Sequence, residues 1–141
     1  MDDKYDLERF VKEQRRIYSD AYEEVSSGKK RSHWMWYIFP QIVGLGMTAT
    51  SRKYSIKSLD EAKAYYEHPY LGKNLRDISR ALLVLNTNDS YEVFGSPDCL
   101  KLRSCMTLFS EAVPSDDVFQ KVLDKFYGGQ KDKRTLKIIY E

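Results

Sequence analysis

Two stretches of the chain concentrate residues that could bind or transform a ligand. The first, KRSHWMWYIFPQIVGLG (30–46), holds both tryptophans and one of the two histidines. The ordinary pKa of histidine lies near neutrality, so His33 is the best single candidate for acid–base chemistry. Trp34 and Trp36 offer flat faces on which a ring could stack, and Gln41 could read an amide or base edge. Packing of both tryptophans in the core is the simpler explanation of those two residues.

A glycine-containing loop closes this stretch. Residues 44–49 read GLGMTA and match the letters of the dinucleotide-binding G-x-G-x-x-A motif. That motif requires a preceding strand and a following helix in a βαβ unit, an alternation that this sequence lacks. A loop with Gly44 and Gly46 could still expose backbone N–H groups to a phosphate, with Arg52 and Lys53 close behind. A flexible surface loop beside surface charge explains the pattern equally well.

The second stretch is DCLKLRSCMTLF, residues 98–109. At about 100° per residue, large apolar residues share one side of a helix; they are Leu102, Met106 and Phe109. Arg103 and Thr107 fall on the other side, with Ser104 nearby. An arginine with hydroxyls one turn away suits a phosphate or a carboxylate. A surface Arg–Asp pair would give the same pattern.

Composition limits the class of protein. The chain has 141 residues, 42% of them hydrophobic and 31% charged, which indicates one globular domain. The net charge of +2 is too small to argue for nucleic acid, and the local basic clusters are explained as solvated surface. No apolar run approaches the ~20 residues that span a bilayer, and the charged N-terminus does not resemble a signal peptide.

Metal and cofactor motifs are missing from the sequence. Cys99 and Cys105 lie on different faces of a helix and have no second Cys/His pair beside them, which favours two reduced thiols in a cytoplasmic protein. His33 and His68 are far apart in the chain, and there is no HExxH motif, P-loop or Ser-His-Asp order. We therefore predict no metal and no cofactor.

Helix signals recur along the whole chain, which predicts a mostly α-helical single domain over residues 1–141, with about six helices and long loops. Residues 6–26 form the first helix, with Asp6 as its cap, and residues 32–39 are either helix or strand. Residues 44–51 are a loop. A capping box in residues 58–61 predicts the next helix. Pro69 begins another, whose buried stripe extends to about Asn86. Further helix starts are predicted at residues 96–98, 114–117 and 132.

The sequence resembles the bacterial family known as domain of unknown function 1810, sometimes mislabelled calpastatin. The likeness rests on DLERFVKEQ, GKKRSHWMWYIFPQIVGLG, SLDEAKAYYEHPYLGKNLRD, FGSPDCLKLRSCMTLF and FYGGQKDKRTL, and covers nearly the whole chain in order. It implies a compact helical domain and carries no established reaction. Cys105 stands where many members have serine. The motif residues match position by position: Ser32, His33, Trp34, Trp36, Pro40, Gln41, Gly44, Gly46, Asp98, Lys101, Arg103, Ser104 and Thr107.

A shorter likeness concerns Glu61. The segment EAKAY, residues 61–65, is similar to the glutamate-centred helix of the YbiA-like N-glycosidases, which act on ADP-ribose or ribosyl-phosphate derivatives. The likeness implies that Glu61 moves a proton. A role as the capping-box partner of Ser58 explains the same residue and is favoured.

Together these observations predict a pocket built from SHWMW and KLRSCMTLF. It would bind or hydrolyse a nucleotide or ribose-phosphate derivative, with His33 and Glu61 as catalytic residues. A non-catalytic nucleic-acid or protein interaction module is the alternative. The predicted ligand contacts are Ser32, Trp34, Trp36, Gln41, Gly44, Gly46, Lys101, Arg103, Ser104 and Thr107.

Overall fold

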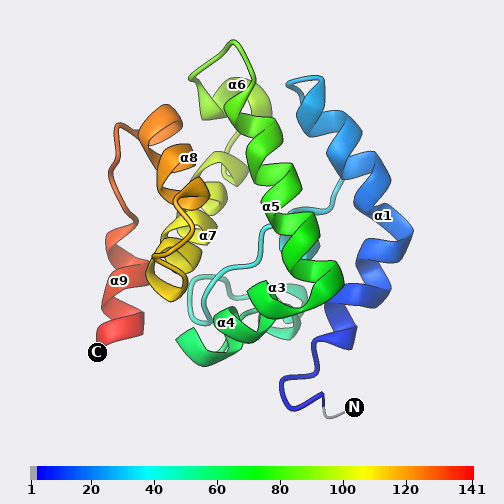
Figure 1. Ribbon diagram of the computed structural model, residues 1–141, viewed down its shortest axis with the longest axis vertical. Helices are drawn as coiled ribbons and strands as arrows, with labels where there is room; N and C mark the ends of the chain where they lie inside the picture. Colours follow the sequence, from blue (N-terminus) through cyan, green and yellow to red (C-terminus); the bar gives the residue numbers. More distant parts are fainter. Residues whose placement is uncertain (1–2) are drawn as a thin grey trace.

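The computed structural model describes residues 3–141, which fold into nine helices (Figure 1). The helices are α1 (Glu8–Ser26), α2 (Met35–Ile38), α3 (Ala49–Lys53), α4 (Leu59–Glu67), α5 (Pro69–Leu83), α6 (Ser90–Phe94), α7 (Asp98–Ala112), α8 (Val118–Tyr127) and α9 (Lys133–Tyr140). The only β-structure within residues 3–141 is one parallel bridge between Ile42 and Ile56. The predicted mostly α-helical bundle is confirmed.

Helix α7 is the centre of the bundle. It packs against α4, α6, α8 and α9, while α1 and α5 pack against each other on the other side of the molecule (Figure 1). The Phe109 ring lies 5.6 Å from Phe119 and 5.5 Å from Tyr65, measured between centroids. Residues 104–110 are buried without a break. Helix α7 therefore buries its polar side as well as its predicted apolar side over this span.

Several helix ends form where the sequence marks them. The Ser58 hydroxyl accepts a hydrogen bond from the backbone N–H of Glu61 at 3.1 Å, and the Asp132 carboxylate accepts one from Thr135 at 2.9 Å. These contacts satisfy N–H groups that a helix start leaves unpaired. Helix α8 ends at Gly128 in the left-handed conformation, with a φ of 61°.

The predicted cap of the first helix is wrong. Asp6 has a φ of 52°, and Leu7 occupies the cap position without a side-chain hydrogen bond. Asp3 does the capping instead, since its carboxylate accepts from the N–H groups of Leu7 at 2.7 Å and Glu8 at 3.0 Å. A tight turn brings this more distant carboxylate back to the helix start, which local spacing does not reveal.

Residues 3–141 form nine helices where about six were predicted, because short helices carry too little periodicity to recognise. The open choice for residues 32–39 is resolved as the single-turn helix α2, and α6 was not predicted. Helix α5 ends at Leu83 rather than near Asn86.

Helix α3 begins inside the stretch 44–51 that was predicted as a loop. Thr48 caps it by accepting a hydrogen bond from the N–H of Ser51 at 3.0 Å.

Among the described residues, no helix is both long and apolar enough to cross a membrane.

Candidate functional site

The segment that carries His33 is held by one buried carboxylate, that of Glu24 in α1. Its Oε1 accepts hydrogen bonds from Arg31 N at 2.6 Å, Ser32 N at 2.9 Å and Trp34 Nε1 at 3.0 Å. Its Oε2 accepts one from Ser32 Oγ at 2.6 Å. Burial raises the pKa of Glu24, but the hydrogen bonds outweigh burial and lower this pKa to about 2. Ser32 was predicted to contact a ligand. Its amide and hydroxyl instead donate hydrogen bonds to Glu24 and hold this segment in position.

The two tryptophans have different surroundings. Trp34 is 1% exposed, and its ring lies 6.2 Å from Phe39 and 6.4 Å from Phe94 between centroids. Trp36 is half-buried and keeps part of its ring at the surface. Trp34 is therefore a core residue, and Trp36 is the tryptophan that offers ring surface to a ligand.

The two chemistry-bearing stretches meet where Lys101 lies over Trp36. The Lys101 Nζ is 4.5 Å from the ring centroid, within the range of a cation–π contact. The same ammonium is 3.2 Å from Asp98 Oδ1, and Asp98 Oδ2 is 2.9 Å from Lys30 Nζ. A chain of alternating charges thus connects the start of α7 to the segment before α2.

A cavity of about 470 Å³ lies beside this contact, and we call it the Arg103 cavity. It is enclosed by residues 41–51, the start of α7 and the start of α9. Its charged lining residues are Lys101, Arg103, Arg134 and Asp132. Its apolar lining residues are Trp36, Leu45, Met47, Pro97 and Leu100. Three cations against one carboxylate, next to an apolar wall, suit a molecule with an anionic group and a flat or apolar part.

Two buried nitrogen donors in this cavity have no hydrogen-bond partner within the described residues: Gln41 Nε2 and Arg103 Nε. Gln41 is only 3% exposed. The contact from Arg103 Nη2 to Asp132 Oδ1 measures 3.9 Å, which is too long for a hydrogen bond. A buried donor without a partner costs about 1–3 kcal/mol, and the great majority of buried polar groups have one. Both atoms belong to residues that line the cavity, and both are covered by their neighbours.

Gly46 lines the Arg103 cavity at a position that has no room for a side chain. A Cβ at this position would lie 2.6 Å from the Ser51 Cβ and Oγ and 3.0 Å from Trp36 Cη2, so only glycine fits. Gly44 lies outside the cavity, with a φ of 99°, and a Cβ there would be 3.4 Å from the Ile138 side chain. Gly44 and Gly46 were predicted to bind phosphate through their backbone N–H groups. The close approach of Gly46 to Trp36 gives this glycine a steric role in packing the loop against the tryptophan.

A smaller cavity of about 280 Å³ shares Trp36 and Lys101 with the first, and we call it the His33 cavity. His33 is exposed at its edge. Tyr37 and Thr50 also line it, and sequence analysis did not select either residue. Tyr37 belongs to the aromatic run after His33, and Thr50 belongs to the hydroxyl-bearing stretch between the glycine loop and Arg52; these were the available signals.

Glu61 lies away from both cavities. It is 1% exposed; its Oε2 accepts a hydrogen bond from Arg9 Nη2 at 2.7 Å, and its Oε1 accepts one from Lys57 N at 3.0 Å. It lines a third cavity, of about 540 Å³, together with Arg9 and Lys57 but without His33. The structure therefore does not bring the two predicted catalytic residues together.

The polar residues of α7 divide into two groups. Ser104 lines the Arg103 cavity, and its hydroxyl donates to Leu100 O at 3.3 Å. Thr107 is fully buried; its hydroxyl donates to Arg103 O at 2.8 Å and accepts from Asp132 N at 2.9 Å. Thr107 was predicted to contact a ligand, but it does not line the cavity. It joins α7 to the start of α9 through these two hydrogen bonds.

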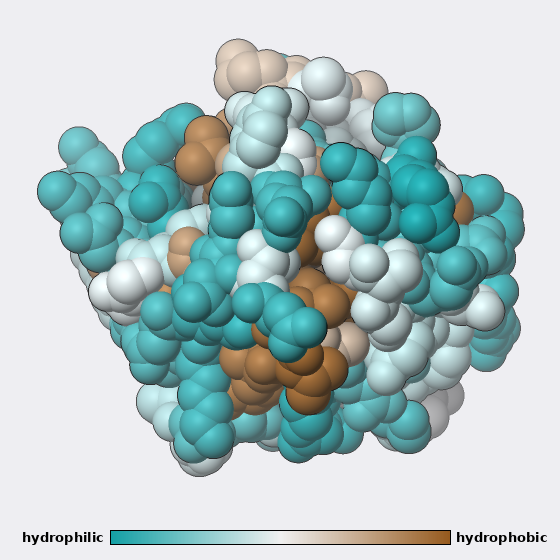
Figure 2. Space-filling model, turned by 90° about the horizontal axis from the view of Figure 1, so that it is seen from above, coloured by the Kyte–Doolittle hydropathy of each residue, from teal (hydrophilic) through white to brown (hydrophobic). Residues whose placement is uncertain are grey.

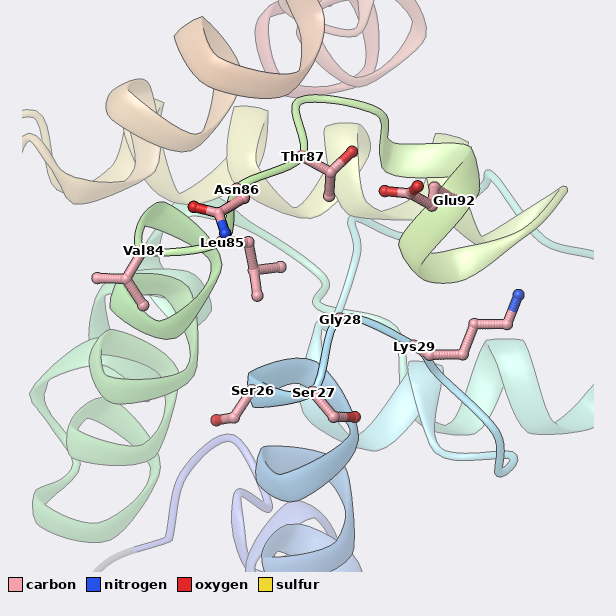
Figure 3. Close-up of a pocket in the computed structure, with 9 residues that line it drawn as sticks. All are labelled: Ser26, Ser27, Gly28, Lys29, Val84, Leu85, Asn86, Thr87 and Glu92. Carbon is pink, nitrogen blue, oxygen red and sulfur yellow. The ribbon is translucent and has the colours of Figure 1, made fainter.

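A larger hollow, of about 750 Å³, lies at the end of the molecule where α1 and α5 terminate. Figure 2 looks down on this end and shows apolar surface between hydrophilic side chains. Leu85 extends into the gap between residues 84–87 and residues 26–29 (Figure 3). Val84 at its rim is 81% exposed. None of the unpartnered buried side-chain atoms of residues 3–141 belongs to its lining, so it gives no indication of a polar ligand.

Both cysteines are free thiols. Cys105 is buried, and burial raises the pKa of its thiol well above the ordinary value. Within residues 3–141, no three His, Cys, Asp or Glu side chains are grouped as a metal site would require.

Comparison with known proteins agrees with the sequence and the fold. The chain is similar over 99% of its length to a conserved hypothetical protein, Rv1873 from Mycobacterium tuberculosis, whose crystal structure it matches with 42% identity, a TM-score of 0.96 and 99% coverage of that chain. No curated protein gives a significant match. A family model described as "Protein of unknown function (DUF1810)" matches residues 4–139. The chain therefore belongs to the DUF1810 family.

Proposed function

We propose that this protein binds a small molecule carrying an anionic group and a flat ring, a nucleotide or a ribose-phosphate derivative, in the Arg103 cavity. The observation that carries the proposal is the Arg103 guanidinium, which makes no hydrogen bond to a described residue and belongs to a side chain that is 29% exposed, in a cavity whose charged residues are mainly cationic. A phosphate offers several acceptor oxygens and a negative charge, which is what this guanidinium lacks.

A second arginine of the same chain shows what a structural guanidinium looks like. Arg9 makes hydrogen bonds through Nε and both Nη atoms to Lys53 O, Tyr5 O, Asp6 O, Ser55 O and Glu61 Oε2, all within 2.9 Å. Arg103 makes no side-chain hydrogen bond to the described residues, although its Nε is buried. Arg103 lies over the Tyr127 ring, 5.8 Å from its centroid, but that contact leaves its N–H donors without acceptors, which supports a ligand-binding role.

The ring of the ligand has a place beside Trp36. Lys101 already lies over this ring, and Leu45 and Leu100 continue the apolar wall of the cavity. Stacking on an aromatic side chain is worth roughly 1–3 kcal/mol per base, and charge-assisted hydrogen bonds contribute a similar amount. After the costs of association, we expect dissociation constants in the roughly micromolar to millimolar range.

Binding rather than hydrolysis is the activity that we propose. An N-glycosidase-like mechanism assigned proton transfer to Glu61, but both oxygens of that carboxylate are engaged, by Arg9 and by Lys57 N. The carboxylate that lines the His33 cavity is Asp98, which pairs with two lysines. Product analysis after incubation with each ligand tests for turnover directly.

The experiment is a titration with ADP-ribose, NAD, mononucleotides and ribose 5-phosphate at low salt, followed by tryptophan emission and by the melting temperature. Trp36→Phe should remove most of the emission change, since Trp36 exposes part of its ring whereas Trp34 is 1% exposed. Arg103→Gln should weaken binding about 10- to 100-fold. Arg15→Gln, at an exposed arginine of α1, is the matched control and should bind normally.

Three further results decide the proposal. His33→Ala and Arg103→Ala should each change the unfolding free energy by less than about 1 kcal/mol, because neither side chain makes a short contact that the fold depends on. Binding that is unaffected by Arg103→Gln would place the ligand elsewhere. If no ligand at millimolar concentration changes either signal, the nucleotide proposal is wrong.

An interaction module is the second candidate function. The observation that favours it is the third cavity, whose lining includes Lys4, Arg52, Lys53 and Lys57 in addition to Arg9. Burial, together with the charge of the neighbouring arginine, lowers the pKa of Lys57. Binding of oligonucleotides that weakens steeply with salt and is lost in Arg52→Gln/Lys53→Gln would favour this function over the first.

A cytoplasmic location, supported by the two free thiols, accompanies both proposals.

A further inference from the structure

We infer that the ligand lies across Trp36, with its phosphate in the Arg103 cavity and its neutral, hydroxyl-bearing part in the His33 cavity. This inference rests on the proposed function and specifies it: the ligand is a phosphate ester of a sugar or nucleoside rather than a small anion, and Tyr37 and Thr50 are specificity residues.

The first step is that the two cavities are neighbours. Both are lined by Trp36 and Lys101, so these two residues border both cavities. Trp36 is half-buried, and Lys101 is held by a cation–π contact and one ion pair. One molecule can therefore contact both cavities at once without a change in the backbone.

The second step is that the cavities differ in charge. In the His33 cavity, both lysines pair with Asp98, which lies 2.9 Å from Lys30 and 3.2 Å from Lys101. In the Arg103 cavity, Arg103 has the long 3.9 Å contact with Asp132 and a position 5.8 Å from the Tyr127 ring centroid, and Arg134 has no ion pair within residues 3–141. The free positive charge is in the Arg103 cavity, and that is where a phosphate binds.

The third step concerns the groups that the His33 cavity offers. The His33 imidazole, the Tyr37 hydroxyl and the Thr50 hydroxyl make no hydrogen bond to another described residue, yet all three residues line the cavity. Hydroxyl groups that both donate and accept, beside an imidazole, match the hydroxyls of a sugar or the polar edge of a base. A bare anion would leave these groups unused.

The fourth step is size. Small-molecule sites usually measure roughly 300–1,000 Å³. The His33 cavity, at about 280 Å³, falls below that range and suits part of a ligand, while the Arg103 cavity, at about 470 Å³, falls within it. A ligand that fills both has two chemically different ends, joined where Lys101 lies between them.

The test is calorimetric titration of the full chain with four probes: inorganic phosphate, ribose 5-phosphate, adenosine 5′-monophosphate and adenosine. Tyr37→Phe and Thr50→Val remove one hydroxyl each and keep the shape of the side chain; the Tyr37 ring retains its edge contact with Tyr54, 4.8 Å between centroids. Tyr22→Phe, at an exposed tyrosine of α1, is the matched control.

We expect at least one of the two phosphate esters to bind more tightly than inorganic phosphate. The double variant Tyr37→Phe/Thr50→Val should weaken that ester about three- to tenfold per hydroxyl lost, and should leave the affinity for inorganic phosphate unchanged. Arg103→Gln should weaken the esters and inorganic phosphate alike. Adenosine should bind weakly and should respond to the double variant but not to Arg103→Gln.

The results that overturn the inference differ from those that overturn the proposed function. Esters that bind no better than inorganic phosphate, or that ignore the Tyr37→Phe/Thr50→Val change while still responding to Arg103→Gln, would confine the ligand to the Arg103 cavity and refute only the inference. Absence of binding by all four probes, or binding that ignores Arg103→Gln, would refute the proposed function and the inference with it.

Discussion

Replacing Glu24 with glutamine tests how the site is held in place. The substitution keeps the shape of the side chain and removes its charge. In the native protein the carboxylate accepts four hydrogen bonds, two from Ser32 and one each from Arg31 and Trp34. Hydrogen bonds to an ionised acceptor are about twice as strong as those between neutral groups. Glu24→Gln should therefore destabilise the fold and loosen the segment that carries His33.

The magnitude follows from the pKa of Glu24, which the hydrogen bonds lower from 4.5 to about 2. Each pKa unit corresponds to about 1.4 kcal/mol, so the ionised carboxylate contributes on the order of 3 kcal/mol. Because the pKa is lower in the folded state, this stability is fully present above about pH 4.5 and is lost as the pH falls toward 2. The difference between the native protein and Glu24→Gln should shrink over the same interval.

Urea unfolding followed by circular dichroism at pH 7, 4 and 3 measures both quantities. The matched control is Glu23→Gln on the same helix: its carboxylate lies 3.2 Å from Arg31 and its side chain is 71% exposed. An exposed ion pair of this kind contributes at most about 1 kcal/mol. A Glu24→Gln variant as stable as Glu23→Gln at pH 7, or a difference that stays constant down to pH 3, would show that this carboxylate does not hold the segment.

Three other substitutions give direct predictions. Arg9→Lys breaks most of the guanidinium contacts and weakens the buried pair with Glu61, so the unfolding free energy in urea should fall by about 3–5 kcal/mol. Phe109→Ala removes a fully buried ring at the centre of α7 and should cost about 3–5 kcal/mol in the same assay, with no selective effect on ligand binding. Gly46→Ala places a methyl group 2.6 Å from Ser51, and it should cost about 1–3 kcal/mol and alter tryptophan emission before any ligand is added.

The fold was predictable where one helix face or one capping residue decides the outcome. The long helices α1, α5 and α7 repeat their apolar residues over several turns, and Ser58 and Asp132 cap their helices as predicted. Short helices such as α2 and α6 have no room for a period, and tertiary packing stabilises them. Asp3 caps α1 through a turn of the chain, which neighbouring residue types do not encode.

The site was predictable at the level of segments and less so at the level of side chains. Trp36, Gln41, Gly46, Lys101, Arg103 and Ser104 all line the Arg103 cavity. Ser32, Gly44, Glu61 and Thr107 line neither of the two cavities that meet at Trp36. Each of the latter residues has a local role in the backbone or in a buried hydrogen bond. Tyr37 and Thr50 were not among the predicted contacts, because their place in the His33 cavity depends on how α2 and α3 pack.

The polar residues of the two motifs therefore have two different origins, and hydrogen-bond satisfaction separates them. Thr107 uses its hydroxyl twice, once to each of the residues that frame the cationic end of the cavity, Arg103 and Asp132. Arg103 itself leaves a buried donor unpaired. A polar residue that the fold has satisfied explains how the cavity keeps its shape, whereas a polar residue that the fold leaves unsatisfied costs stability in the free protein. In the proposed function, an acceptor that reaches the guanidinium of Arg103 recovers that cost, whereas the polarity of the motifs as a whole does not distinguish a ligand site from a satisfied core.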